Sequence, residues 1–212
     1  AWVDVALESH GAAVARTQHD ILFDNRILAL SSPFACQINP AIGAEDITCF
    51  DPTVTAPCKT LHSNLVTCGT EPQPEGCPVG APHTVSRFRG EITSVANNNL
   101  ITDGVLYTCV FDVLNAAALP TTLLNTRVIA TGPDTALLTA VGQNGVVAAA
   151  AIPATATVSP TAVPSATPVR AATASPTIVL PLLTPTPTPA LLPTSTLVPG
   201  MARLEVGDAV VV

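Results

Sequence analysis

The fold is decided by the stretch Val105-Leu106-Tyr107-Thr108-Cys109-Val110-Phe111-Asp112-Val113. Apolar residues occupy every second position from 105 to 113, so the odd-numbered side chains share one face of an extended chain. Asp103-Gly104, directly before this stretch, is a hairpin turn signal. The stretch therefore predicts a β-strand with its odd-numbered face in a core.

The same period of two recurs on both sides of this strand. Val3, Val5 and Leu7 alternate with Asp4, Ala6 and Glu8, Ile21 and Phe23 share a face, and Phe88 and Ile92 oppose Arg87, Arg89 and Glu91. Residues 121–131 predict another strand, with Leu124 and Val128 on one side. Turn signals such as Asn39-Pro40 and Asn144-Gly145 separate these runs. Many short alternating strands between such turns indicate an all-β sandwich.

The chain divides into three regions by composition. Residues 1–151 hold all the aromatic residues and all six cysteines, and we expect them to form the sandwich. Within them, residues 45–83 carry four cysteines and little periodicity, and we interpret them as a disulfide-rich insertion. Residues 152–200 form an extended Thr/Pro-rich linker, and residues 201–212 return to strand-like alternation as a C-terminal β-strand.

Charge and hydropathy exclude several partners. The 212 residues include 8 Lys and Arg against 15 Asp and Glu, for a net charge of −7. An acidic chain repels nucleic-acid phosphates and anionic membrane surfaces, so we expect neither as a partner. No apolar run reaches the ~18 residues of a membrane span. The chain starts in a strand-like run, as in a mature chain whose export signal has been removed.

The six cysteines predict three disulfides formed in an oxidising compartment. Cys49 and Cys58 share their C-x8-C spacing with Cys68 and Cys77, which suggests two local loops, and Cys36 and Cys109 would then join across the sandwich. Six cysteines permit 15 pairings, so this connectivity is a hypothesis. The alternative is a zinc site, which needs closer cysteine pairs than this chain has. We expect no metal or other cofactor.

Residues 152–200 resemble an O-glycosylated stalk. Between Pro153 and Pro199 lie 11 prolines, 11 threonines and 4 serines, with Arg170 as the single charge. The chain has no N-x-S/T sequon, so O-linkage is the form of glycosylation expected. The candidate sites are Thr155, Thr157, Ser159, Thr161, Thr167, Thr184, Thr186, Thr188, Thr194 and Thr196. The simpler interpretation is a flexible linker.

Three segments together resemble the cohesin-like modules, which belong to the carbohydrate-binding-module-like sandwiches. They run from Val14 to Asp24, from Ile101 to Val113, and from Thr131-Gly132-Pro133-Asp134 through Asn144-Gly145-Val146-Val147. The resemblance implies a jelly-roll topology. The chain departs from cellulosomal cohesins in its cysteine-rich insertion, and it carries no dockerin or catalytic module.

Cohesin-like domains usually open with a strand resembling I-x-V-G-x-x-x-G-x-P-G-D. Here the chain begins at what looks like the family's second strand, Trp2 to Glu8, and a segment resembling the opening strand lies at residues 202–209. A sandwich without one strand exposes a sheet edge that pairs readily with another chain. We therefore expect a donor strand whose inward residues are Ala202, Leu204, Val206, Val210 and Val212.

The expected function is structural. The partner would be another copy of the chain, and repeated head-to-tail donation would build a filament or fibre on the outside of a bacterial cell. Two other interpretations of the strand stay open, namely insertion into its own body and membership of a tandem array. The alternative function is a secreted cohesin-like binding or adhesion module on a glycosylated stalk, with a dockerin or polysaccharide as ligand.

Signals for catalysis are weak, and we expect no enzyme. His10, His19, His62 and His83 have no paired spacing and are expected on the surface or in loops. Two of the three residues Glu91, Asp103 and Asp112 could be imagined as a glycosidase pair. Acidic residues are, however, common beside strand turns. Trp2 either stacks on a sugar or packs under a neighbouring segment.

Overall fold

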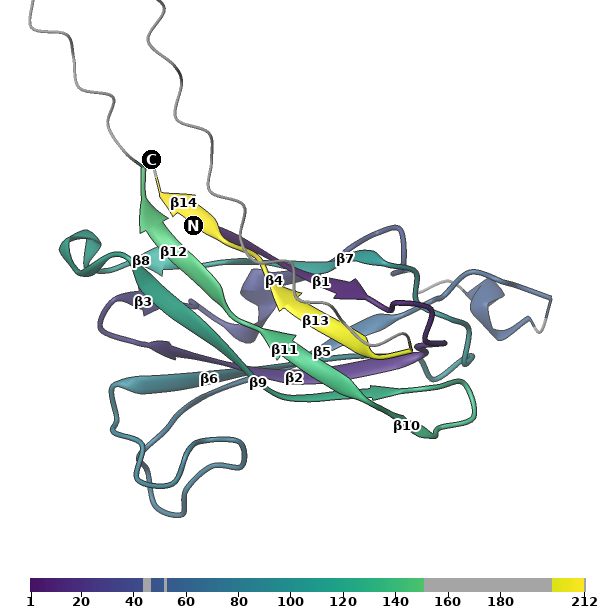
Figure 1. Cartoon of the computed structure of the whole chain (residues 1–212), viewed down its shortest axis with the longest axis horizontal. Helices are drawn as coiled ribbons and strands as arrows, with labels where there is room; N and C mark the ends of the chain where they lie inside the picture. The colour runs from purple at the N-terminus through teal and green to yellow at the C-terminus, as the bar shows by residue number, and fades with distance from the viewer. Residues whose placement is uncertain (44–46, 52, 151–199, 212) are drawn as a thin grey trace, which may run out of the picture. The chain divides into compact units, whose positions relative to one another are not determined.

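The computed structural model describes residues 1–43, 47–51, 53–150 and 200–211 (Figure 1). About half of the described residues lie in strands, in two large sheets and one small one. The residues after position 200 belong to the same compact unit as the N-terminal body. The alternating pattern of the sequence therefore produces the all-β fold that we predicted.

The first sheet has five strands in the order β11-β13-β1-β7-β4. These are β11 Ala140–Gln143, β13 Ala202–Val206, β1 Trp2–Glu8, β7 Gly104–Val110 and β4 Cys36–Ile38. Strand β13 comes from the far end of the chain yet lies inside this sheet, between β11 and β1 (Figure 1).

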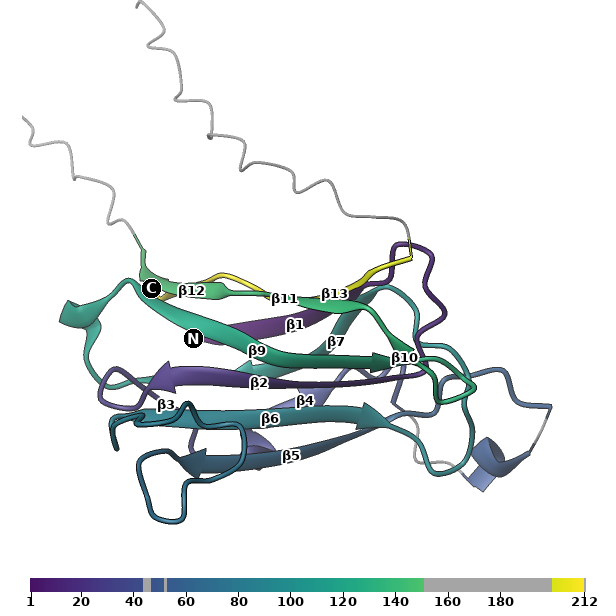
Figure 2. The ribbon, with the colours of Figure 1, turned by 60° about the horizontal axis from the view of Figure 1, so that its bottom comes forward.

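The second sheet runs in the order β14-β12-β9-β2-β6-β5, and β10 (Leu137–Leu138) pairs with β9 off this path. Its strands are β14 Ala209–Val211, β12 Gly145–Ala149, β9 Thr121–Thr131, β2 Arg16–Asp24, β6 Val85–Thr93 and β5 Thr60–Thr67. Figure 2 shows β9, β2, β6 and β5 side by side as one layer. The small sheet pairs β3 (Leu28–Ala29) with β8 (Asp112–Val113). Three short 3-10 helices cover Pro33–Ala35, Ile47–Phe50 and Ala116–Ala118.

One hydrophobic core joins residues of both large sheets. Val3, Val5 and Leu7 are fully buried from β1, in the predicted alternation. Phe23 from β2 meets Phe111 edge to face, with ring centroids 5.2 Å apart.

The stretch 105–113 departs from one continuous strand. It breaks at Phe111 into β7 and β8, which lie in different sheets. Leu106 is buried together with Tyr107, because the register of β7 against β1 shifts between Val5 and Ala6.

Two further sequence predictions were wrong in detail. Leu124 and Val128 do not share a side: Leu124 is 44% exposed, whereas Val128 packs against the core. Arg127, between them, has φ 50°, and this left-handed residue resets the alternation of β9. Residues 45–83 are also not wholly an irregular insertion, because Thr60–Thr67 within them forms edge strand β5, paired with β6.

Three disulfides join the cysteines as Cys36–Cys109, Cys49–Cys58 and Cys68–Cys77. The first links directly opposite residues of β4 and β7, and the other two close loops on either side of β5. Three disulfides are typical of a secreted or extracellular protein. Among the described residues, none of the helices has the length and apolar character needed to cross a membrane.

Candidate functional site

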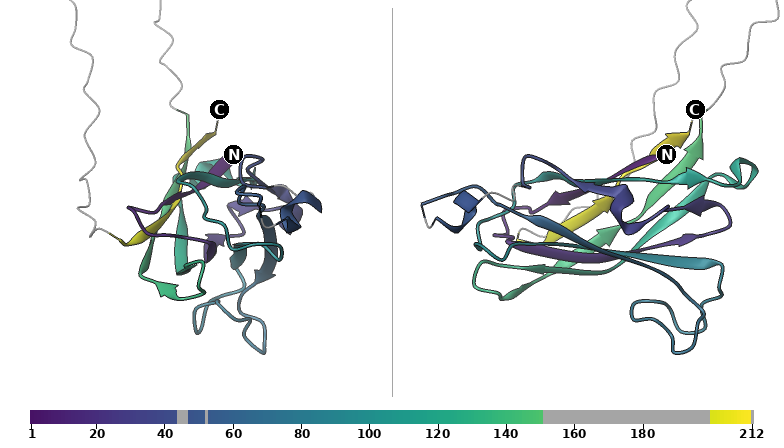
Figure 3. Two further views of the ribbon diagram at one scale, coloured as in Figure 1. Left: turned by 90° about the vertical axis from the view of Figure 1, so that its right-hand side faces the viewer. Right: turned by 180° about the vertical axis from the view of Figure 1, so that it is seen from behind.

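The most distinctive site is the position between β1 and β11 that β13 fills, and we call this position the groove. On one side β13 pairs antiparallel with β1, with Leu204 opposite Leu7 and Val206 opposite Val5. On the other side it pairs parallel with β11, with Leu204 opposite Gly142. Figure 3 shows, from behind, the yellow C-terminal strands running alongside the green β11 and β12. Without this segment, β1 and β11 would each present an unpaired edge.

The inward face of the segment is apolar. Ala202, Leu204 and Val206 are at most 1% exposed and belong to the core. Burial of Leu204 and Val206 alone contributes about 3–6 kcal/mol gross, at about 1.5–3 kcal/mol per side chain. These three residues were predicted to face inward, whereas the side chains of Val210 and Val212 lie outside the described residues.

Ala209, which was not predicted, is also buried at the start of β14. Its burial follows from Gly207-Asp208, where the segment leaves the first sheet and joins the second. The change of sheet shifts the buried position from the even-numbered Val206 to the odd-numbered Ala209.

The outward face of β13 carries charge. Arg203 lies 3.6 Å from Glu8 and 3.6 Å from Glu205, and the Gln143 amide donates to Glu205 at 3.4 Å. Partly exposed pairs of this kind contribute at most about 1 kcal/mol each. Burial of the apolar face therefore contributes more than these ion pairs to the free energy that holds β13 in the groove.

Two strands change sheets at one corner. β11 becomes β12 at Asn144, and beside it β13 becomes β14 at Gly207-Asp208. The Gly207 N–H donates to Asp4 O at 2.8 Å, and the Val146 N–H donates to Asp208 Oδ1 at 2.8 Å. A Cβ on Gly145 would lie 2.6 Å from Gly207 O, so only glycine permits this close approach of the two backbones.

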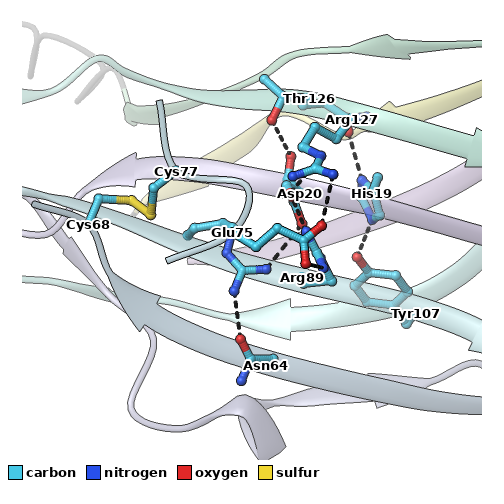
Figure 4. A network of polar contacts seen from close by, with 12 residues as sticks. His19, Asp20, Asn64, Cys68, Glu75, Cys77, Arg89, Tyr107, Thr126 and Arg127 are labelled. Carbon is cyan, nitrogen blue, oxygen red and sulfur yellow. Dashed lines mark hydrogen bonds and ion pairs between the residues drawn. A yellow bond between two sulfur atoms is a disulfide. The ribbon is translucent and has the colours of Figure 1, made fainter. Parts of the chain in front are cut away.

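A buried chain of polar groups reaches the inserted strand from the core. The Asn125 Nδ2 amide donates to Leu204 O at 2.8 Å, and Asn125 Oδ1 lies 2.7 Å from His19 Nδ1. His19 Nε2 in turn meets the Tyr107 hydroxyl, as Figure 4 shows. Because an amide oxygen only accepts, His19 carries its proton on Nδ1 and accepts from Tyr107 through Nε2.

Burial decides the protonation states of His19 and Tyr107. Desolvation lowers the pKa of His19 to about 4, although Asn125 and the charge of Asp20 oppose the shift. Desolvation also raises the pKa of Tyr107 well above its usual value. Both groups are therefore neutral at pH 7, in the states that the hydrogen bonds require.

Next to His19, Asp20 points to the opposite face of the second sheet. Its carboxylate is fully buried and accepts from Arg89 at 2.7 and 3.0 Å and from Arg87 at 3.3 Å (Figure 4). Glu75 extends the cluster to Arg127 at 2.9 Å. Glu75 lies in the loop closed by Cys68–Cys77, so the cluster fastens that loop to the sheet.

The histidine prediction was wrong for His19, which is buried in the core. A signal was present in the sequence, because position 19 shares its phase with Ile21 and Phe23. The other histidines are not brought together: His10 lies 3.4 Å from Glu8, His62 meets Thr60, and His83 lies in the loop before β6.

The imagined acidic pair is not assembled either. Glu91 lies on β6, Asp112 lies on β8 of the small sheet, and Asp103 accepts from the Ser9 N–H at 2.7 Å. Within the part of the chain that the structure describes, no group of three or more His, Cys, Asp or Glu side chains is placed to hold a metal ion. The O-glycan candidates from Thr155 to Thr196 lie outside the described residues.

Comparisons with protein-family models, with curated proteins and with solved structures gave no match.

Proposed function

We propose that this protein is a non-catalytic structural subunit of an extracellular filament or surface fibre on a bacterial cell. The C-terminal strand of one copy occupies the groove of the next, in a jelly-roll sandwich of the cohesin-like kind. The partner is therefore another copy of the chain, and the Thr/Pro-rich segment carries O-linked glycans.

The observation that carries this proposal is the long connection to an interior strand. β11 and β13 run parallel, so a chain that fills its own groove must return from the end of β12 to the start of β13. That return spans about ten strand residues, or ~33 Å. The intervening segment, residues 150–201, reaches ~160 Å when extended at ~3.1 Å per residue. It is several times longer than the return requires.

The contacts of the groove are the same whether the strand comes from its own chain or from a second copy. The single chain of the structure offers β13 only its own groove, so the connecting segment decides between the two arrangements. A freely flexible segment of this length favours its own groove, with an effective concentration in the millimolar range. The proline content between Pro153 and Pro199 favours extended polyproline II, which opposes the return and favours a second copy.

The geometry of exchange leads to a polymer. The groove and the donated strand are different surfaces, so the contact is heterologous and leaves a free groove and a free strand at the ends. Repetition then gives an open filament or a ring. Disulfides suit such an assembly outside the cell, because they stabilise each subunit by about 2–4 kcal/mol apiece.

The test is electron microscopy together with light scattering of the purified full chain over a range of concentrations. We expect filaments from the parent chain and none from Leu204→Arg, which places a charge in the core. Glu205→Ala, on the outward face of the same strand, is the matched control and keeps the filaments. A parent chain that stays monomeric at every concentration contradicts the proposal.

Exposed aromatic residues favour the second candidate function, a cohesin-like adhesion module that binds a polysaccharide or a dockerin. Trp2 is 73% exposed and Phe34 is 85% exposed, and exposed aromatic rings are common at binding interfaces. Retention of the parent chain on a polysaccharide column, lost in Trp2→Ala, identifies this function. A filament subunit without such binding passes through the column.

A further inference from the structure

The inserted strand needs a device that sets its register. In a strand, side chains alternate with a period of two, so a slip of two residues keeps every side chain on its own face. After a two-residue slip, β13 can therefore still form backbone hydrogen bonds with β1. The bond from Asn125 to Leu204 O does not prevent such a slip, because any residue supplies a carbonyl there. Asn125 thus holds whichever strand enters the groove.

We propose that Gly207-Asp208 is the recognition element by which the groove accepts its strand in a single register. The groove then selects segments of the pattern Ala-x-Leu-x-Val-Gly-Asp. A second copy of this chain carries that pattern, and this last step rests on the proposed function.

A slip in one direction is opposed by Asp208. In the observed register Val206 lies opposite Val5 and is buried in the core. Moving the segment by two residues so that Glu205 faces Glu8 brings Asp208 into the place of Val206. A carboxylate without partners in an apolar core is strongly disfavoured. The same slip removes the Oδ1 acceptor that Asp208 offers to the Val146 N–H.

A slip in the other direction is opposed at the place of Gly207. It brings Glu205 into that position, where a Cβ lies 3.1 Å from Asp4 O. Backbone atoms of a central strand yield little, so this contact is unfavourable. It also places Ala202 where the larger Leu204 fills the core, which leaves a cavity. The two-residue element therefore disfavours both slips.

Strands on both sides of the inserted segment contact Gly207-Asp208. Asp4 belongs to β1, which accepts the Gly207 N–H at 2.8 Å, and Val146 belongs to β12, which donates to Asp208. Gly145 allows the backbone of Gly207 to approach. A segment that lacks Gly-Asp at this spacing keeps the ladder but loses these contacts.

Engineered disulfides in the full chain test the register. Glu8→Cys with Arg203→Cys reports the observed register, in which these positions are directly opposite. Glu8→Cys with Glu205→Cys reports the slip that buries position 208. All three positions face outward, and the disulfides formed are mapped by mass spectrometry.

We expect the first pair to form and the second to stay reduced. Adding Asp208→Ala shifts the ratio toward the second pair by more than the about 2- to 10-fold that loss of one hydrogen bond predicts, because the slip then buries an alanine instead of a carboxylate. Asp208→Asn keeps an acceptor oxygen and a polar side chain, so it preserves the parent ratio. Free formation of the second pair in the parent, or a ratio unchanged by Asp208→Ala, overturns the inference.

A non-reducing gel of the same cysteine variants separates this inference from the proposed function. A link between positions 8 and 203 of different chains gives a ladder of multimers, and this supports strand exchange between copies. A link within one chain gives a monomer band, which contradicts the filament while the register comparison still decides the role of Gly207-Asp208.

Discussion

At the scale of residues, two neighbours on β2 perform different tasks. His19 faces the core and supports Asn125, which holds the C-terminal strand. Asp20 faces outward and binds the arginines beneath the Cys68–Cys77 loop. Both are buried polar groups whose hydrogen bonds are made, and removal of a partner leaves the other group unsatisfied.

His19 makes stability depend on pH. Its pKa is about 4 in the folded protein, against about 6.5 when exposed, so the unfolded state binds more protons between these values. The contribution is complete above pH 6.5, and it is lost progressively as the pH falls through that window toward 4. We expect the free energy of unfolding to fall by about 3 kcal/mol over the window from this group.

Urea denaturation at a series of pH values measures this slope. His19→Gln keeps an amide between Asn125 and Tyr107 but does not titrate, so its stability falls less steeply between pH 6.5 and 4. Equal slopes in the parent and the variant contradict the assignment.

At the scale of elements, one disulfide ties an edge strand to its neighbour, and another closes a local loop. Cys36–Cys109 holds the short edge strand β4 to β7, whereas Cys68–Cys77 closes a local loop. A bond across a longer stretch of chain restricts the unfolded state more. The two bonds span 73 and 9 residues.

We therefore expect unequal costs when each bond is removed. Cys36→Ser with Cys109→Ser lowers the free energy of unfolding by about 4 kcal/mol, and Cys68→Ser with Cys77→Ser lowers it by about 2.6 kcal/mol, from loop closure. Urea denaturation of the two double variants measures the difference. A larger cost for the local loop would show that the Asp20 cluster, not chain entropy, sets the value of that bond.

At the scale of the whole molecule, one interior strand is supplied from a distant part of the chain. The groove is satisfied by the same contacts in one chain or between chains. Under the proposed function, we therefore expect the length of residues 150–201 to decide whether the strand fills its own groove or that of another copy. The length of the connecting segment can therefore be varied to test the state of assembly.

A deletion series tests the relation by light scattering. Deletion of 156–190 leaves 17 residues that reach ~56 Å, so the strand returns to its own groove and the chain becomes monomeric. Deletion of 152–198 leaves five residues that reach ~17 Å, too short for the return, and forces exchange between copies. A 152–198 deletion that is a stable monomer would show that the strand is dispensable.

The sequence alone determined the class of the fold and the inward faces of β1 and β13. Alternation at Val3, Val5 and Leu7, and at Ala202, Leu204 and Val206, was enough because a strand repeats every two residues. The equal C-x8-C spacings suggested the pairing that the structure contains. These are local patterns, readable without knowledge of distant neighbours.

Tertiary structure decided what depends on distant neighbours. The left-handed Arg127 reset the alternation of β9, and β5 became visible only through its pairing with β6. The burial of His19 and its link through Asn125 to Leu204 join three segments that lie far apart in the chain. Period and spacing describe one segment at a time, whereas register and buried polar contacts exist only between segments, and so β11, the second neighbour of the inserted strand, could be identified only from the folded chain.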